Sequence, residues 1–417
     1  MATVQLVGNA DAAEFCPCEP YLNIVAAASY TLQEGEQPVR LGELYLFSAE
    51  KLRINETSNS SSTLSLKQVY HRETSGVFDL KWRPWSDRTS NPCLAQASAD
   101  GTLRLHMLEE NEKATTSSSA LNLREAAGAQ ISPSMCLYVD WNPSSASESP
   151  HVAVSHSDGS LSVVDIGQGE LEVISSWDAH GFEAWVVSYD SWKPQILFSG
   201  GDDSQFCCWD LRDTQTPVFR DRRTHQMGVC SIQSNPLLEN ILVTGSYDEY
   251  VRLWDLRMIQ KPLMQVELGL GGGVWRLKWH HKDSGLILAA CMHNGFAIAR
   301  IEGGEITVLE QYEEHKSLAY GGSWYRGDWE QTWSTETGSS AQDINDASRM
   351  LDGLGISGDV NRRTESHQME EAGETEALDE RIPSFNASRR STCLVATCSF
   401  YDKALHIWEP KTLAFGF

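Results

Sequence analysis

The 417-residue chain lacks the features that mark several large functional classes. It contains no run of about eighteen apolar residues, so the sequence predicts no membrane-spanning helix. The first eleven residues include no basic residue and no long apolar core, and we therefore expect no secretory signal. Lysine and arginine number 33 against 57 Asp and Glu. This balance argues against binding nucleic acid through its phosphates, which needs clustered basic side chains.

The motifs of common catalytic sites are also missing. There is no Gly-x-Ser-x-Gly nucleophile elbow, no phosphate-binding loop that ends in Lys-Ser/Thr, and no His-Glu-x-x-His. Cysteines are present, but Cys16/Cys18 and Cys207/Cys208 lack the two-residue spacer of a zinc knuckle, so we expect no metal and no other cofactor. Without a signal peptide, the ten cysteines are expected to be reduced and buried in a cytoplasmic protein.

What the chain does contain is a repeat with a period of 45 residues. Each copy has a His, a short apolar strand, a second strand that ends in small residues, a tight acidic turn, and a strand that closes on Trp-Asp. The first copy reads His180, Trp185, Asp203, Trp209 and Asp210, and the second reads His225, Cys230, Asp248, Trp254 and Asp255. A period of about 40–45 residues with a closing Trp-Asp is typical of a blade of a WD-repeat β-propeller.

Weaker copies extend the repeat in both directions and bring the count to seven. They begin near Glu14, Phe78, Leu137, Leu270 and His315, and the last copy is completed only by the segment from Ser399 to Trp408. The sequence therefore predicts an all-β protein, a single seven-bladed WD-repeat propeller over residues 1–417. A four-stranded blade cannot bury its own faces, so stability requires neighbours stacked in a closed ring. We expect the alternating segment 3–7 to pair with the last blade and close that ring.

A polar segment interrupts the seventh blade between Trp324 and Leu394. From Asp328 to Glu380 it contains fourteen Asp and Glu against three Arg, a net charge of −11. We predict that residues 328–390 form a disordered acidic insertion, because like-charged polar stretches of this length cannot bury enough apolar surface to fold.

Two positions in each blade are expected to face the central channel, where concave binding sites form. One lies five residues after the blade's His, and the other lies just before the turn Asp. The first set is Phe78, Leu137, Trp185, Cys230, Trp275 and Tyr320; the second is Ala99, Ser157, Asp202, Tyr247, Met292 and Tyr401. The aromatic members either plug the channel or form a cage for a cation or a platform for a peptide. As substrate-binding candidates we select Trp185, Tyr247, Trp275, Tyr320 and Tyr401.

Several stretches together resemble one family, the WD-repeat diphthine methylesterases of the diphthamide pathway. They include Ser176-Trp177-Asp178-Ala179-His180 and Gly245-Ser246-Tyr247-Asp248, and they cover residues 176–185, 199–203, 225–233, 244–249, 272–276, 290–293 and 394–408. The resemblance is close from about 176 to 300, weak before 70 and absent over 330–390. It implies a carboxylic ester hydrolase that removes a methyl ester from methylated diphthine on a modified His of translation elongation factor 2. The substrate would carry a trimethylammonium group, which an aromatic cage could hold.

No family motif assigns the catalytic groups, so two mechanisms stay open. In the first, Cys230 attacks the ester and His225 or His293 serves as the base. In the second, which we favour, Glu183, Asp202 or His293 activates water. His225 also has a structural interpretation, because the blade His of a WD repeat usually hydrogen-bonds the Ser/Thr–Asp–Trp set that ties a blade together, to which Asp203 and Asp248 belong.

The rival interpretation is a non-catalytic adaptor. Trp209-Asp210-Leu211-Arg212 and Trp254-Asp255-Leu256-Arg257 resemble the Trp-Asp-x-Arg motif by which some propellers dock as substrate receptors on cullin-RING ubiquitin ligases. The simpler explanation is that Arg212 and Arg257 pair locally with the neighbouring Asp. A passive chaperone of the elongation factor is a third possibility. We expect a monomer with no nucleic-acid or membrane partner.

Overall fold

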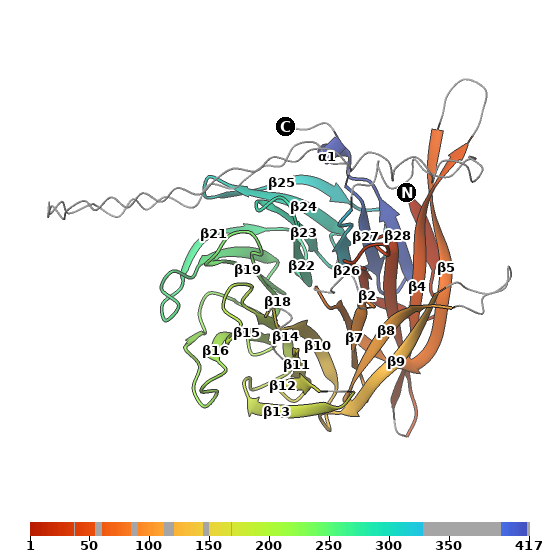
Figure 1. Ribbon diagram of the computed structural model, residues 1–417. Helices are drawn as coiled ribbons and strands as arrows, with labels where there is room; N and C mark the ends of the chain where they lie inside the picture. Colours follow the sequence, from red (N-terminus) through yellow and green to blue (C-terminus); the bar gives the residue numbers. More distant parts are fainter. Residues whose placement is uncertain are drawn as a thin grey trace, which may run out of the picture.

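The computed structural model describes residues 1–36, 38–54, 61–84, 91–111, 121–144, 150–167, 169–327 and 393–414. Over these residues the chain forms seven antiparallel sheets of four strands each. The sheets are arranged around a common axis, as the ring of coloured arrows in Figure 1 shows. The seven-bladed propeller predicted from the repeat is therefore confirmed. The predicted insertion at residues 328–390 lies outside the described residues.

Blades one to three come from the N-terminal part of the chain. Blade one consists of β2 (Asn9–Phe15), β3 (Ile24–Gln33), β4 (Val39–Ile54) and β5 (Ser61–Ser75). Blade two consists of β6 (Val77–Trp82), β7 (Cys93–Ser98), β8 (Thr102–Glu110) and β9 (Leu121–Gln130). Blade three consists of β10 (Cys136–Trp141), β11 (His151–His156), β12 (Ser160–Ile166) and β13 (Leu171–Asp178).

Blades four to seven follow in the same order. Blade four consists of β14 (Ala184–Tyr189), β15 (Ile196–Gly201), β16 (Phe206–Asp210) and β17 (Phe219–Asp221). Blade five consists of β18 (Val229–Ser234), β19 (Ile241–Ser246), β20 (Tyr250–Asp255) and β21 (Leu263–Gly269). Blade six consists of β22 (Arg276–Trp279), β23 (Leu286–Ala290), β24 (Phe296–Glu302) and β25 (Glu305–Tyr312). Blade seven consists of β26 (Ala319–Trp324), β27 (Val395–Ser399), β28 (Ala404–Trp408) and β1 (Ala2–Gln5), and helix α1 (Lys411–Ala414) follows it.

The first strand of the chain closes the ring, as predicted. β1 pairs with β28 in antiparallel register, with Ala2 opposite Ile407 and Gln5 opposite Ala404. Blade seven is thus built from both ends of the described chain, and its β26 and β27 flank the interruption. Pairing the chain's own N-terminal strand satisfies the backbone groups of β28, which would otherwise form an open edge.

Tight turns set the register within each blade. At the β7–β8 and β11–β12 turns, Gly101 and Gly159 adopt φ values of 77° and 87°, a region that glycine enters at low cost. The preceding Asp100 and Asp158 accept hydrogen bonds from the backbone N–H groups of Thr102 and Ser160. The acidic turns of the repeat therefore end one strand and begin the next.

Neighbouring blades share the apolar core and are tied by tryptophan side chains. One continuous buried cluster joins Tyr138 of blade three, Trp209 of blade four and Trp254 of blade five. At the end of the innermost strands, the indole of Trp141 donates to the carbonyl of Lys81 at 2.9 Å, and that of Trp324 donates to the carbonyl of Lys278 at 2.8 Å. Each indole thus spans the gap between one blade and the one before it.

Within the described residues, no helix is long and apolar enough to cross a membrane. All ten cysteines lie in that part of the chain, none forms a disulfide, and nine are buried.

Candidate functional site: two mouths of one channel

The innermost strands β2, β6, β10, β14, β18, β22 and β26 contact one another in a closed ring around the axis. All seven run in the same direction, so the channel has two chemically different mouths. We call the mouth where these strands begin the aromatic mouth, after Trp185, Tyr247, Trp275 and Tyr320. We call the mouth where they end the polar mouth, after Glu14, Lys81, Asp140 and Lys278. Strands of about six residues separate the two mouths by roughly 17 Å.

At the aromatic mouth each blade has one residue in an equivalent position, three residues before an equivalent polar residue at the polar mouth; it lies in the innermost strand of six blades and just before β22 in blade six. We call these seven residues the channel ring; they are Asp11, Phe78, Leu137, Trp185, Cys230, Trp275 and Tyr320. In six blades the strand register shifts at this point. Such bulges re-aim a side chain, and they explain why one residue of each of these six strands leaves the sheet face.

The structure brings the selected aromatic residues into one continuous arc. Trp185 and Trp275 meet edge to face with ring centroids 5.6 Å apart. Trp275 stacks on Tyr320 at 4.8 Å and also contacts Tyr247 at 5.8 Å. Tyr320 contacts Phe400 at 4.9 Å. The remaining candidate, Tyr401, is 67% exposed and contacts this arc through Phe400.

The arc partly closes the channel and partly faces outwards. Six of the seven channel-ring residues line a cavity of only about 10 Å³ beneath it, which is room for about one water molecule. A cation-sized ligand therefore does not fit below the rings. The rings of Trp185, Tyr247, Trp275 and Tyr320 are nevertheless only half-buried, so they form a floor on which a ligand can rest.

Two of the catalytic candidates lie beside Trp185. Asp202 is exposed, and its carboxylate accepts a hydrogen bond from the Trp185 indole at 3.0 Å. Glu183 is half-buried, and its carbonyl accepts a hydrogen bond from the Asp202 backbone at 2.9 Å. His293 is exposed in the β23–β24 turn, at the same end of the propeller. The structure therefore brings Glu183, Asp202 and His293 to the aromatic mouth.

His225 and Cys230 are not brought together as a base and a nucleophile. His225 is buried inside blade five, where its Nε2 pairs with Thr244 Oγ1 at 2.9 Å and its ring packs against Trp254. Burial lowers the pKa of His225 to about 4. Cys230 points into the channel instead, and burial raises the pKa of its thiol well above the usual value. A protonated thiol is a weak nucleophile.

The blade-tying role expected of the histidines is complete in blade four; in blade five His225 bonds Thr244, but the described residues show no bond from it to Asp248. His180 binds Asp203 through Nδ1 at 2.9 Å and Ser199 through Nε2 at 2.8 Å. Trp209 donates to the same Ser199 hydroxyl at 2.8 Å. Burial alone would raise the pKa of Asp203, but the hydrogen bonds from His180 and two backbone N–H groups outweigh it and lower that pKa.

The middle of the channel contains a charged cluster that the repeat pattern did not predict. Arg276 forms an ion pair with Asp79 at 3.2 Å, and both side chains are 6% exposed. The guanidinium also lies 4.6 Å from the centre of the Tyr138 ring. The Asp11 side chain is buried in the same region, and burial raises its pKa well above the usual value. Leu137 and Cys230 line the same small cavity as Asp11 and Arg276.

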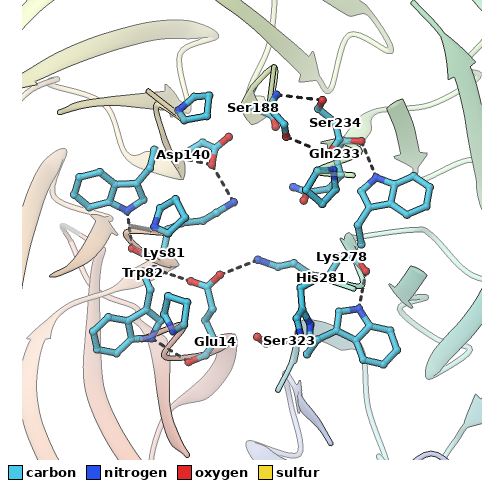
Figure 2. Close-up of a pocket in the computed structure, with 18 of the residues that line it drawn as sticks. Glu14, Lys81, Trp82, Asp140, Ser188, Gln233, Ser234, Lys278, His281 and Ser323 are labelled. Atoms are coloured by element: carbon cyan, nitrogen blue, oxygen red, sulfur yellow. Dashed lines mark hydrogen bonds and ion pairs between the residues drawn. The ribbon is translucent and has the colours of Figure 1, made fainter. Parts of the chain in front are cut away.

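At the polar mouth, which the repeat pattern did not predict, lies a cavity of about 390 Å³. One polar residue from each innermost strand lines it: Glu14, Lys81, Asp140, Ser188, Gln233, Lys278 and Ser323. Figure 2 shows these side chains around a common opening, with Lys81 paired to Asp140 at 3.0 Å and Lys278 paired to Glu14 at 3.2 Å. The sequence pattern that could have revealed this mouth is a polar residue directly before the aromatic or serine residue near the end of each innermost strand.

The two arginines of the Trp-Asp-x-Arg sequences lie at the polar-mouth end of blades four and five, after β16 and β20. Arg212 pairs with Asp210 at 2.5 Å, and Arg257 pairs with Asp255 at 2.6 Å. The local pairing expected as the simpler explanation is thus present. Both side chains also remain largely exposed, at 76% and 56%.

Comparison with known proteins agrees with the fold. The family model for the WD domain, G-beta repeat, matches residues 217–255. Among solved structures, a chain of the mitotic checkpoint complex aligns with TM-score 0.54 and 16% identity over 77% of this chain and 84% of that chain. Sqt1 from Chaetomium thermophilum, bound to the N-terminus of ribosomal protein L10, aligns with TM-score 0.55 and 13% identity over 77% and 79%. At these identities the likeness concerns the fold alone.

Fold and site together define a WD-repeat β-propeller whose channel ends in an aromatic mouth. Curated relatives then specify the family. Diphthine methyltransferase from Mus musculus is 35% identical, covering 97% of this chain and 92% of the relative. The human protein of the same name is 33% identical, covering 98% of each, and a Dictyostelium discoideum homologue is 32% identical over 96% of each. The chain belongs to the diphthine methyltransferase family.

The relatives also correct one expectation. The sequence resemblance implied a carboxylic ester hydrolase, a diphthine methylesterase. The relatives that cover almost the whole chain are instead named for methyl transfer. The predicted enzyme class was therefore wrong, and methyl transfer is the chemistry that the relatives indicate.

Proposed function

We propose that this protein acts in diphthamide biosynthesis, in the methyl-transfer chemistry of diphthine, and that the aromatic mouth binds the diphthine side chain on translation elongation factor 2. The reaction class and diphthine come from the names of the relatives. The observation that supports the location is the half-buried aromatic arc, because diphthine carries a trimethylammonium group and such cations bind the faces of aromatic rings.

The outward-facing rings suit a ligand that is attached to a large protein. A modified histidine at the tip of a protein surface can reach the floor of a shallow mouth, whereas a closed cavity would require the ligand to enter alone. Exposed apolar side chains surround the arc, including Phe182 at 63%, Met227 at 53% and Tyr401 at 67%. Phe182 and Met227 occupy equivalent positions two residues after the blade His. We propose that they contact the elongation factor around the modified residue.

Polar groups at the same mouth are the candidates for handling protons during the reaction. Glu183, Asp202 and His293 are accessible from the mouth. Asp202 is the strongest of them, because its hydrogen bond to Trp185 fixes a carboxylate beside an aromatic ring of the proposed site. His225 and Cys230 are weaker candidates because both are buried and neither is activated by its surroundings.

The test compares the methyl state of elongation factor 2 in cells with and without this protein. Mass spectrometry of the peptide with the modified histidine should show, in cells lacking the protein, accumulation of a species that differs by a methyl unit. Re-expressing the wild-type chain should restore the normal species, and a variant with Trp185→Ala and Trp275→Ala should not. An unchanged methyl state in the deleted cells would reject the proposed function.

A second candidate function is that of a ligase adaptor. It is favoured by the exposure of Arg212 and Arg257 on adjacent blades, and a partner could replace their local ion pairs. Changing both arginines to Ala and isolating the protein from cells tests this directly. Loss of a cullin-RING ligase from the isolate, with the methyl state of the elongation factor unchanged, would indicate two separate functions. Absence of the ligase from the wild-type isolate would reject the adaptor role.

A further inference from the structure

Asp11 is the single ionisable carboxyl group of the channel ring. The equivalent positions in the other blades are Phe78, Leu137, Trp185, Cys230, Trp275 and Tyr320, which are aromatic, aliphatic or thiol side chains. In blade one the strand register shifts between Ala10 and Ala12, so Asp11 is bulged from its strand as its equivalents are. The carboxyl group thus lies within the same ring as the aromatic floor.

The Asp11 carboxyl is buried but incompletely partnered. Its residue is 1% exposed, and within the described part of the chain its Oδ2 atom has no hydrogen-bond partner. It lines the small cavity beneath Trp185 and Trp275. Burying a carboxyl group in this way costs free energy unless a partner compensates for it. The positive charge of a ligand resting on the rings would offset part of this cost through space, without a hydrogen bond.

The nearby cation does not fully satisfy Asp11. Arg276 is paired with Asp79, whose second oxygen also accepts a hydrogen bond from the Val139 backbone. One guanidinium therefore faces two carboxyl groups. In the arc, burial and after it the negative charge of Asp11 raise the pKa of Tyr320. When Asp11 is ionised, Asp11 and Asp79 are both negative and Arg276 is the one positive group between them, so this cluster has a net negative charge.

We propose that Asp11 is the counter-charge of a quaternary-ammonium site, and that the channel ring selects a cationic ligand over a neutral ligand of the same shape. This inference rests on the proposed function, in which the ligand is the trimethylammonium of diphthine. The rings provide the contact surface and Asp11 provides the charge from beneath them. At an effective dielectric constant of about 20, a unit charge some 10 Å away changes an affinity by roughly tenfold.

Choline and 3,3-dimethylbutan-1-ol form a matched pair of probes, because they have the same shape and differ in the charge of one central atom. Ligand-observed NMR titration of the full chain with each probe measures the preference for charge directly. We expect the wild-type protein to bind choline about tenfold more tightly than the neutral alcohol. Equal affinities for the two probes in the wild-type protein would overturn the proposal.

The variant Asp11→Asn keeps the shape and removes the charge. It should lose most of the preference for choline while its affinity for the alcohol stays within about twofold of wild type. Asp190→Asn is the matched control, because Asp190 is also a buried carboxylate, 2% exposed, but follows the end of β14 at the polar mouth. The control should keep the full preference. An Asp11→Asn protein that keeps the preference for choline would overturn the proposal. If the asparagine variant does not fold, Asp11→Ser gives the same comparison.

The outcome separates this inference from the proposed function. If the choline preference depends on Asp11 but the methyl state of elongation factor 2 does not depend on the protein, the cation site stands and the proposed function fails. If the methyl state depends on the protein but the wild-type chain shows no preference between the two probes, the proposed function stands and the role of Asp11 is rejected.

Discussion

At the scale of single residues, Trp275 occupies the centre of the aromatic arc, where it contacts Trp185, Tyr247 and Tyr320. Replacing Trp275 by Ala should raise the KM for diphthine-bearing elongation factor 2 by roughly 3- to 30-fold, because a cation over an aromatic face gains about 0.5–2 kcal/mol. Steady-state kinetics checks this. Trp192→Ala is the control, since Trp192 is an exposed indole beyond β14 at the opposite mouth. Equal KM values for all three proteins would argue against the aromatic site.

Cys230 lies next to the same rings, but its chemistry predicts a different outcome. Burial keeps its thiol protonated at neutral pH, so it cannot serve as an activated nucleophile. We expect Cys230→Ala to retain kcat within about threefold of wild type, with any loss arising from the small cavity that the change creates. A fall in kcat of about a thousandfold, in a variant with an unchanged melting temperature, would show instead that the thiol takes part in the reaction.

Asp11 should also affect how stability depends on pH. Its folded-state pKa is raised by burial, so at pH values between the unfolded-state and the folded-state pKa the folded protein holds a proton that the unfolded chain releases. Stability therefore falls as pH rises between the unfolded and folded pKa values, by up to about 1.4 kcal/mol per pH unit. Arg276 and Asp79 modify this shift in opposite directions. Asparagine does not titrate, so Asp11→Asn should become more stable relative to wild type as pH rises.

Urea denaturation of the wild type and of Asp11→Asn, between about pH 5 and about pH 8, measures this difference. Asp79 and the other titrating groups are common to both proteins and cancel to first order in the comparison. Parallel stability curves over the whole range would show that Asp11 does not titrate with a raised pKa.

At the scale of the blade, one hydroxyl in each of blades four and five joins the His and the Trp that tie the blade. In blade five, Thr244 Oγ1 bonds both His225 and Trp254 at 2.9 Å. Thr244→Val keeps the shape but leaves both buried nitrogens without this partner, so the free energy of unfolding should fall by about 2–4 kcal/mol. Chemical denaturation measures the change. Thr307→Val, on an exposed position of β25, is the control and should be nearly neutral. A loss below about 0.5 kcal/mol for Thr244→Val would show that the hydroxyl is dispensable.

At the scale of the whole molecule, much of the fold was predictable because the repeat concentrates signal at fixed positions. The 45-residue displacement placed two blades directly, and closure followed from the need to pair the last edge strand. The same displacement found four channel-ring residues, Trp185, Cys230, Trp275 and Tyr320, and looser copies of the pattern found Phe78 and Leu137. Asp11 was missed because the degenerate first copy was traced only from Glu14, three residues after it. All seven channel-ring residues are found when the position is counted back three residues from the polar residue at the other end of each innermost strand.

The charged groups of the channel could not be predicted, because their partners come from blades far apart in the sequence. Arg276 of blade six pairs with Asp79 of blade two, and Lys278 pairs with Glu14 of blade one. Residues so far apart in the sequence belong to no local pattern, so their pairing could not be predicted.

The position of the candidate catalytic residues in the fold was unpredictable for a related reason. Whether His225 faces the channel or the interior of its blade depends on the packing of Phe206 and Trp254 around it.

The ring closure gives a prediction for the molecule as a whole. Because β1 completes blade seven by pairing with β28, deleting residues 2–5 should expose the edge of β28 and remove apolar contacts of Val4. We expect a lower melting temperature and concentration-dependent aggregation, measured by calorimetry and light scattering. The double variant Thr3→Ala with Gln5→Ala keeps the backbone pairing and changes only exposed side chains, so it should remain monodisperse. If the deleted protein melts like the wild type, the ring does not depend on its N-terminal strand, and the contacts between neighbouring innermost strands must suffice to close it.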